Sequence, residues 1–183
     1  MDQFIDRVKN ILLSPVETWE SIKTENLNRK DILQQYLLYI VAIPAIALFV
    51  GLVIVGHYGD TAGFFTGLIK AVLFYILNVL SVFAGAYAIN QLAPSFGCEK
   101  DEDAALQLVA YSLTAYFVIG VLFIIPVLEP FIILGFYSIY LLYKGLPVVM
   151  KCPEEKVVNF TIVSGLILFC LVIISYGLAN LII

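Results

Sequence analysis

One stretch decides the fold class: residues 64–92, which read FFTGLIKAVLFYILNVLSVFAGAYAINQL. The stretch contains one charged residue, Lys70, and no proline. A helix needs about 20 consecutive apolar residues to cross the hydrocarbon core of a bilayer. Because this stretch is longer than that, we expect a tilted helix that spans a membrane.

Four further stretches are apolar and long enough, or nearly so, to span a membrane. The five predicted spans are residues 32–55, 64–92, 104–125, 127–146 and 157–183. Pro44 lies in the middle of the first span. A tight turn from Pro126 to Pro130, with Glu129 near the outer surface, separates the third span from the fourth, because proline interrupts a helix. The sequence therefore predicts an all-α, polytopic membrane bundle of about five transmembrane helices.

The composition agrees with a membrane protein. Of the 183 residues, 62% are hydrophobic and only 13% are charged. A soluble domain usually carries about a quarter charged residues, so the apolar excess is too large for one water-soluble core. The net charge is -4 and no dense stripe of Lys and Arg occurs, so we expect no nucleic-acid partner.

The basic residues predict the orientation, because short cytoplasmic segments carry an excess of Lys and Arg. With five spans and the N-terminus inside, nine of the ten basic residues fall on the cytoplasmic side, and the tenth, Lys70, lies within the second span. The nine are Arg7, Lys9, Lys23, Arg29, Lys30, Lys100, Lys144, Lys151 and Lys156. We therefore expect a cytoplasmic N-terminus and a C-terminus on the outer side.

Residues 1–31 form a distinct head before the transmembrane domain, residues 32–183. Residues 2–13 have the spacing of an amphipathic helix, and Ser14-Pro15-Val16-Glu17 predicts a second helix with a capping box. The apolar faces include Phe4, Val8 and Trp19. Two interpretations remain open: the head docks on the membrane or a partner, with these three residues in contact, or it packs on the cytoplasmic end of the bundle.

The search for catalytic chemistry finds almost nothing. No nucleophile, phosphate-loop or zinc motif is present, and we expect no catalytic residue, cofactor or metal site. The single histidine, His57, has the place of an interfacial anchor. The acidic run at residues 99–103 either holds a divalent cation or begins the third span, with Asp101 as its cap. The second interpretation is preferred.

The three cysteines have no metal-ligand spacing. They are Cys98, Cys152 and Cys170. The first two lie in the predicted cytosolic loops, where thiols stay reduced. We therefore predict that Cys98 and Cys152 are not bridged.

Polar residues within the spans mark a candidate site, because such groups are costly in a membrane. Lys70, Asn78 and Ser81 fall on one face of the second span together with small residues. This polar seam either packs helices, with Asn78 as the interhelical link, or conducts an ion or holds a lipid headgroup. We also predict that Lys70 turns inward to pair with Glu129, or with Asp60, as an alternative to reaching the outer headgroups.

Three short motifs resemble one family. They are ILLSPVETW at residues 11–19, AYSLT at residues 110–114 and YLLYKGLPVVMKCPEEK at residues 140–156. They resemble prokaryotic members of the Yip family, five-span relatives of the eukaryotic Rab-interacting Yip proteins. In the second motif a proline often follows where this chain has Ala115. The resemblance covers nearly the whole chain.

The resemblance implies a five-span bundle in a prokaryotic inner membrane and offers no catalytic residues. The chain lacks the longer head and the Asp-Leu-Tyr-Gly-Pro-like motif of the eukaryotic relatives, so GTPase binding is not carried over. The leading hypothesis is a non-enzymatic protein that organises lipid or protein partners, with membrane lipids and a second copy or another membrane protein as partners. The alternative is a small oligomeric transporter or channel that uses the polar seam. An enzyme acting on a lipid is a weaker third hypothesis.

Overall fold

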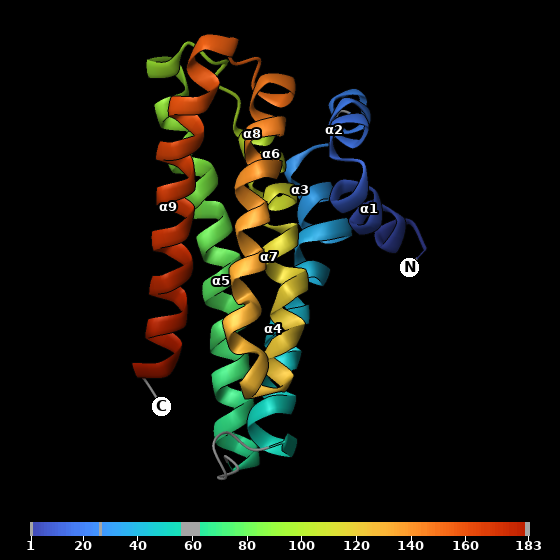
Figure 1. Ribbon diagram of the computed structural model, residues 1–183, viewed down its shortest axis with the longest axis vertical. Helices are drawn as coiled ribbons and strands as arrows, with labels where there is room; N and C mark the ends of the chain where they lie inside the picture. The colour runs from blue at the N-terminus through green and yellow to red at the C-terminus, as the bar shows by residue number, and fades with distance from the viewer. Residues whose placement is uncertain (1, 26, 56–62, 182–183) are drawn as a thin grey trace.

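A computed structural model describes residues 2–25, 27–55 and 63–181 of the chain (Figure 1). Within these ranges the chain is helical and no strand occurs. The N-terminal part contains α1 (Asp2–Leu13), α2 (Pro15–Thr24), α3 (Arg29–Ile32), η1 (Leu33–Leu37), α4 (Leu38–Val50) and η2 (Gly51–Val55). The remainder contains α5 (Phe64–Leu92), η3 (Ala93–Phe96), α6 (Glu102–Ser112), α7 (Thr114–Ile119), η4 (Gly120–Ile124), η5 (Pro126–Phe136), α8 (Tyr137–Val149) and α9 (Glu154–Leu181). The segments η1 and η2 are π-helical, and η3 to η5 are 3₁₀-helical.

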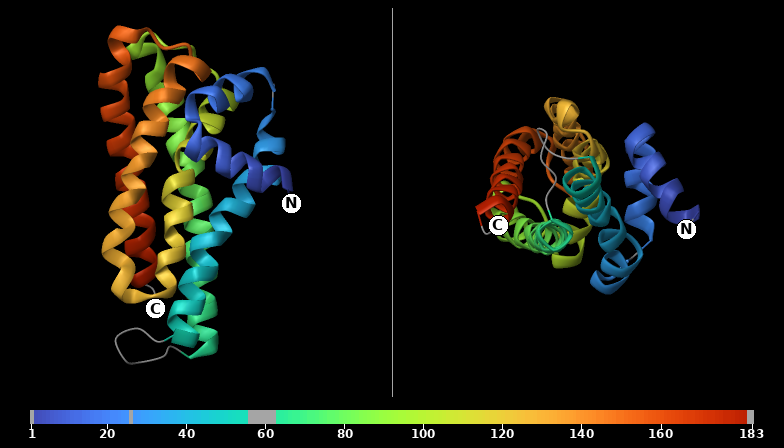
Figure 2. Two further views of the ribbon diagram at one scale, coloured as in Figure 1. Left: turned by 45° about the vertical axis from the view of Figure 1, so that its right-hand side comes forward. Right: turned by 90° about the horizontal axis from the view of Figure 1, so that it is seen from below.

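The predicted all-α membrane bundle is confirmed. Among the described residues, four helical stretches are long and apolar enough to cross a membrane: Arg29–Val55, Phe64–Phe96, Glu102–Ile124 and Glu154–Leu181. Ile133–Val149 is a shorter apolar helix and completes the bundle. The head and the connections before α6 and α9 lie at one end of the bundle, and α9 runs away from that end toward the C-terminus (Figures 1 and 2).

The predicted turn between the third and fourth spans is wrong in detail. The chain turns at Ile125, whose φ of -122° and ψ of 107° are extended, and not across Pro126 to Pro130. Pro126 opens the 3₁₀-helix η5, where its missing N–H costs nothing. Pro130 lies inside η5, and the regular α-helix α8 begins at Tyr137.

The third span is also less regular than one helix over residues 104–125. It is divided at Leu113, whose ψ of 1° interrupts α6 before α7 begins. The hydroxyl of Thr114 donates to the carbonyl of Tyr111 at 2.7 Å and lies 2.6 Å from the hydroxyl of Tyr36. These side-chain bonds fix the break against the first span.

The head shares its core with the bundle. Ile11, Trp19 and Ile22 are fully buried and belong to the same cluster as buried residues of α4, α6 and α8. A second cluster, around Phe74 and Phe123, lies toward the other end of the bundle. The predicted boundary at residue 31 therefore separates the head from the first span along the chain, but the hydrophobic core is continuous between them.

Candidate functional site

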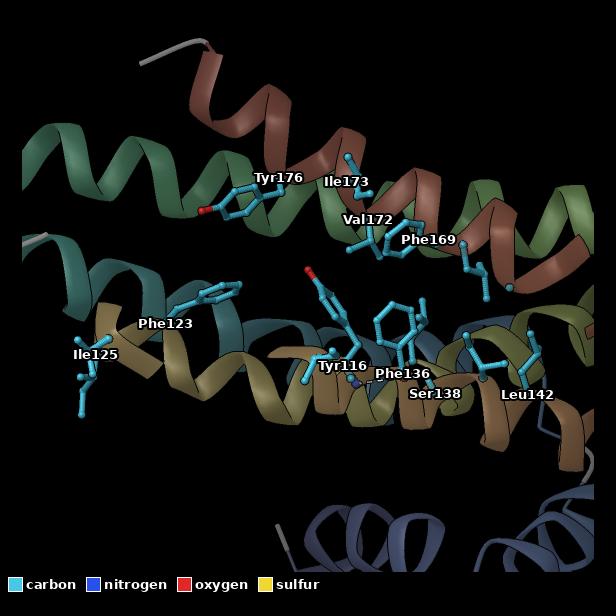
Figure 3. Close-up of a pocket in the computed structure, with 17 residues that line it drawn as sticks. Tyr116, Phe123, Ile125, Phe136, Ser138, Leu142, Phe169, Val172, Ile173 and Tyr176 are labelled. Carbon is cyan, nitrogen blue, oxygen red and sulfur yellow. Dashed lines mark hydrogen bonds between the residues drawn. The ribbon is translucent and has the colours of Figure 1, made fainter. Parts of the chain in front are cut away.

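A large apolar cavity, called the groove below, lies between α9 on one side and α7, η4, η5 and α8 on the other (Figure 3). Its volume is about 1050 Å³. The 17 residues that line it are glycines or hydrocarbon side chains except for Tyr116, Ser138 and Tyr176. Because all these elements belong to the apolar bundle, the groove lies at the depth of the membrane interior.

Two aromatic pairs join the walls of the groove at different heights. Phe136 stacks on Phe169 of α9 with ring centroids 5.8 Å apart, and Phe123 stacks on Tyr176 at 6.1 Å. Ile173 and Phe169 remain about half exposed. The groove is therefore open sideways, where lipid chains surround the protein, while its ends are held by ring contacts.

The width of the groove depends on residues with little or no side chain. A Cβ at Gly165 of α9 would meet Ile139 only at 3.8 Å or beyond, an ordinary van der Waals distance. On the opposite wall, the backbone N–H of Tyr116 donates to the hydroxyl of Ser138 at 3.1 Å. Figure 3 shows the hydroxyls of Tyr116 and Tyr176 directed into the space between the walls. The groove thus offers an apolar channel with a few hydroxyl groups.

Of the predicted polar seam on α5, Ser81 lies at the interface with α9. Asn78 is 1% exposed, and its Nδ2 donates to the Phe74 carbonyl of its own helix at 2.8 Å. Within the described part of the chain its Oδ1 has no partner. Asn78 is therefore not the interhelical link that the packing interpretation expected. Ser81 supplies that link, because its hydroxyl lies 2.6 Å from the hydroxyl of Ser175 on α9.

Lys70 is half-buried on α5, four residues before Phe74. The backbone of Glu129 lies in η5, but its side chain is outside the part that the structure describes, as is Asp60. The pairing of Lys70 with Glu129 or with Asp60 therefore stays a prediction.

The head packs against the bundle at Trp19. The indole Nε1 donates to the Leu141 carbonyl of α8 at 3.1 Å, and the ring meets Tyr111 edge-on at 6.2 Å. Gly145 makes this possible, because a Cβ there would lie 2.7 Å from the indole. At Trp19 the head therefore packs on the end of the bundle, which is the second of the two arrangements predicted from the sequence.

Phe4 and Val8 are half-buried, and Phe4 lies 5.6 Å from Tyr36, centroid to centroid. The apolar residues of the head that remain exposed are Ile5, Leu13 and Val16. Membrane docking by Phe4 and Val8 stays a prediction, whereas Trp19 is buried against the bundle and has no surface left for lipid. The three exposed residues are the surface of the head that offers contact with lipid. Periodicity alone did not separate the two sets, because both belong to the same short helices.

The predicted capping box of α2 is wrong. Ser14 makes no side-chain capping bond. Its carbonyl instead accepts from the backbone N–H and the hydroxyl of Thr18. The start of the third span is as predicted: Asp101 accepts from the N–H groups of Asp103 and Ala104 at 2.9 Å each.

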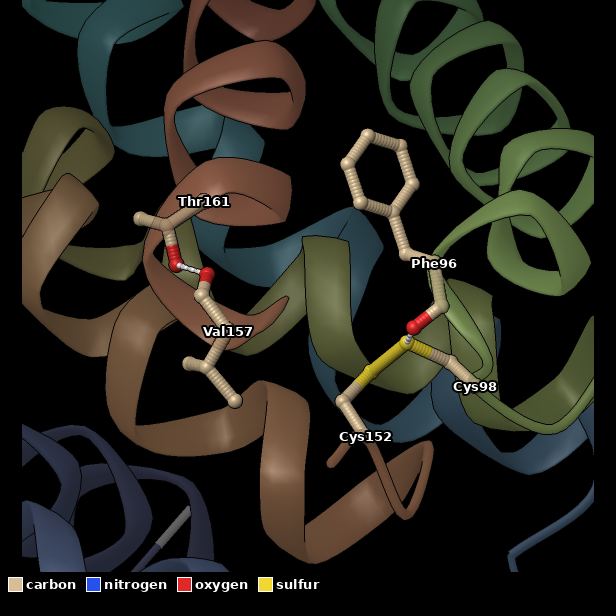
Figure 4. Close-up of a disulfide and its surroundings, with 5 residues drawn as sticks. All are labelled: Phe96, Cys98, Cys152, Val157 and Thr161. Atoms are coloured by element: carbon tan, nitrogen blue, oxygen red, sulfur yellow. Dashed lines mark hydrogen bonds between the residues drawn. A yellow bond between two sulfur atoms is a disulfide. The ribbon is translucent and has the colours of Figure 1, made fainter. Parts of the chain in front are cut away.

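A disulfide joins Cys98 and Cys152, so the prediction that they are not bridged is wrong (Figure 4). The two cysteines are 54 residues apart in sequence, in the connections that precede α6 and α9. The bundle places these connections side by side, with the N–H of Glu99 donating to the Met150 carbonyl at 2.9 Å. An ion pair between Lys151 and Glu99, 2.8 Å, adds to the contact. The error arose because the prediction considered the compartment and not the distance between the loops.

Comparison with known proteins agrees with this architecture. The model of the Yip1 domain matches residues 9–176. The chain is 26% identical, over 94% of its length and 97% of the relative's, to proteins named "Inner membrane protein YohC" from Escherichia coli K12 and Escherichia coli O6:H1. No solved structure matches the chain. Because the family model covers nearly the whole bundle and most of the head, the chain is a member of the Yip1 domain family.

Proposed function

We propose that this protein is a non-enzymatic inner-membrane protein that organises lipid by holding a hydrocarbon chain in the groove between α8 and α9. The observation that carries the proposal is the groove itself, about 1050 Å³ of apolar space at membrane depth and open sideways. This volume is at the upper end of the usual range for small-molecule pockets, roughly 300–1,000 Å³. The relatives named as inner membrane proteins support the location.

Shape selects the occupant of such a groove. Lipid chains are as apolar as leucine, so removal from water gives no advantage to a chain that moves from the bilayer into the groove. Binding then depends on van der Waals contact with fixed walls. The stacked rings at the two heights supply rigid surfaces of this kind. A chain held there is ordered relative to its neighbours, which is the sense in which the protein organises lipid.

The contacts of the polar seam support a transporter or channel less well than they support helix packing. Asn78 is buried and does not line the groove. Ser81 and Ser175 are bonded to each other across the interface between α5 and α9. These contacts favour a packing role for the seam. A cytoplasmic N-terminus remains part of the proposal, because nine of the ten basic residues then lie inside.

The experiment uses a phospholipid with a photoreactive acyl chain, reconstituted with the full-length protein in nanodiscs. We expect labelling to map to α8 and α9 at the groove and to fall severalfold in Gly165→Leu, whose side chain fills the space beside Ile139. Gly177→Leu is the matched control, because it lies on the same helix with nothing within 4 Å of its added Cβ. Equal labelling of the wild type and Gly165→Leu at the groove would contradict the proposal.

A further inference from the structure

A second cavity, called the notch below, lies among α3, α5 and α6 and has a volume of about 240 Å³. Polar residues from each element line it: Arg29 opens α3, Asn90 is in the last turn of α5, and Glu102 opens α6. The start of α3, the C-terminal end of α5 and the start of α6 lie toward the end of the bundle that carries the head (Figure 1). The notch is therefore near the membrane surface, at the depth of lipid headgroups, and separate from the groove.

Asn90 is the reason to expect a polar occupant. The side chain is 1% exposed, and neither Nδ2 nor Oδ1 has a partner within the described residues. An amide offers two N–H donors and one acceptor oxygen, and leaving them unsatisfied in a buried position is unfavourable. A ligand in the notch that both donates and accepts would satisfy this amide. A purely apolar chain would not.

Arg29 and Glu102 give the notch both signs of charge. Arg29 Nη2 donates to Glu102 Oε2 at 2.5 Å, and its Nε lies 3.5 Å from Asp103 Oδ1. The guanidinium has five N–H donors, so it retains capacity for a phosphate beside these bonds. The carboxylate of Glu102 is 63% exposed and retains capacity for an ammonium. A cation and an anion side by side complement a zwitterion better than a ligand with one charge.

We propose that the notch binds the headgroup of a phospholipid that carries a primary ammonium and a phosphate, namely phosphatidylethanolamine. The phosphate takes donors from Arg29 and from the amide of Asn90, and the ammonium donates to Glu102 and to the amide oxygen. The primary ammonium is required because a trimethylated one has no N–H to donate. The proposal rests on the proposed function only in that both give the chain a lipid to hold.

The first experiment varies the lipid and keeps the wild-type protein. Nanodiscs share their acyl chains and differ in headgroup: ethanolamine, its mono- and dimethyl forms, choline and glycerol. Native mass spectrometry then measures which lipid stays bound. We expect retention of the ethanolamine lipid on the order of tenfold above choline, about 1.4 kcal/mol, with stepwise loss on methylation. Equal retention across the series would overturn the proposal.

Variants of the residues that line the notch test whether the preference for ethanolamine lipid arises there. Asn90→Leu, Arg29→Gln and Glu102→Gln should each reduce the ratio of ethanolamine to choline lipid toward one. Glu99→Gln is the matched control, because it breaks a similarly exposed ion pair, with Lys151, at the same end and should keep the ratio. A ratio unchanged in every notch variant that folds would refute the assignment, so the loss of one variant to misfolding still leaves the test decisive.

Two further arms separate the sources and the proposals. Soluble phosphoethanolamine should not compete at concentrations near that of the lipid; if it competes equally, the site takes the free zwitterion and the lipid assignment fails. Gly165→Leu should keep the headgroup preference while it loses acyl-chain labelling. A wild type with groove labelling and no headgroup preference would remove this inference alone, and the reverse result would remove the proposed function alone.

Discussion

The two faces of α9 differ in how closely they meet their neighbours. On one face α9 packs against α5, where a Cβ added at Gly85 would collide with the side chain of Leu168. On the other face Gly165 meets nothing closer than an ordinary contact, and the groove opens. In both places glycine removes a side chain. At Gly85 the side chain of the neighbouring helix fills the space that the glycine leaves, so the two helices lie close together. At Gly165 no side chain of the described residues fills that space, and a cavity remains.

The opposite walls explain this difference. α5 is a continuous α-helix from Phe64 to Leu92, so its residues reach α9 at regular spacing. The wall of the groove opposite α9 consists of α7, η4, η5 and α8. In this wall η4 and η5 are 3₁₀-helical, and α7 begins after the break at Leu113, so the turns are not regular. A regular partner closes the interface, and an irregular one leaves it open. The following changes test this account from the largest expected effect to the smallest.

Replacing both Cys98 and Cys152 by serine should lower stability most. A bridge over 54 residues restricts the unfolded chain, and losing it costs about 2–4 kcal/mol on the usual scale. The connection before α9 then loses its covalent link to the connection before α6, while the interface of α9 with α5 keeps its own contacts. Thermal melting in detergent, with and without reductant, measures the change. A reductant effect that persists in the double variant would show that the bond is not its source.

Gly85→Leu and Gly165→Leu compare the two faces of α9 directly. We expect Gly85→Leu to destabilise by about 1–3 kcal/mol, because the added side chain overfills the contact with Leu168. Gly165→Leu should be nearly neutral, because the groove receives the side chain. Melting of the two purified variants under one condition gives the comparison. Equal losses would contradict the distinction between a closed face and an open one.

The bond between Ser81 and Ser175 should contribute less. Hydrogen bonds between helices in membranes average about 0.6 kcal/mol in double-mutant cycles. We expect a coupling of this order between Ser81→Ala and Ser175→Ala, because their hydroxyls lie 2.6 Å apart. The cycle is measured by melting the two single variants and the double variant. Strict additivity would show that the two hydroxyls do not stabilise the interface.

Asn78→Leu should have the smallest effect on stability. Among the described residues the buried amide bonds to its own helix alone, so replacing it with an apolar group of similar size should be neutral or slightly stabilising. Melting measures this result. If the variant is stable but loses an ion flux that the wild type shows in liposomes, the seam is a pathway and the packing interpretation fails.

Local patterns predicted most of the helical elements. The helices at residues 2–13 and 64–92 coincide with α1 and α5, and Asp101 caps α6 as expected. These features depend on periodicity, apolar length and the chemistry of a few neighbouring residues. The groove, the notch and the disulfide were not predicted, because each depends on distances between residues far apart in the chain.

Two features of the sequence acquire a meaning only once the helices are packed. Asn90 lies near the end of an apolar span, and its full burial follows only from the packing of α5 on α3 and α6. Gly135 and Gly165 belong to different spans, and nothing local indicates that both line one cavity. A polar residue at a span end and paired glycines are the sequence features from which such sites could be suspected in other chains.

Whether the bond between Cys98 and Cys152 forms in the cell depends on the redox state of the compartment that it faces. The bond closes a covalent ring that contains the third and fourth passages through the membrane. Disulfides persist in oxidising compartments and in the cytosol of hyperthermophiles, whereas the distribution of basic residues predicts that this same end faces the cytoplasm. Alkylation of thiols in intact cells before lysis therefore tests which compartment this end of the bundle faces. If Cys98 and Cys152 resist alkylation, they are disulfide-bonded and lie in an oxidising compartment; if both are alkylated, they lie in a reducing one.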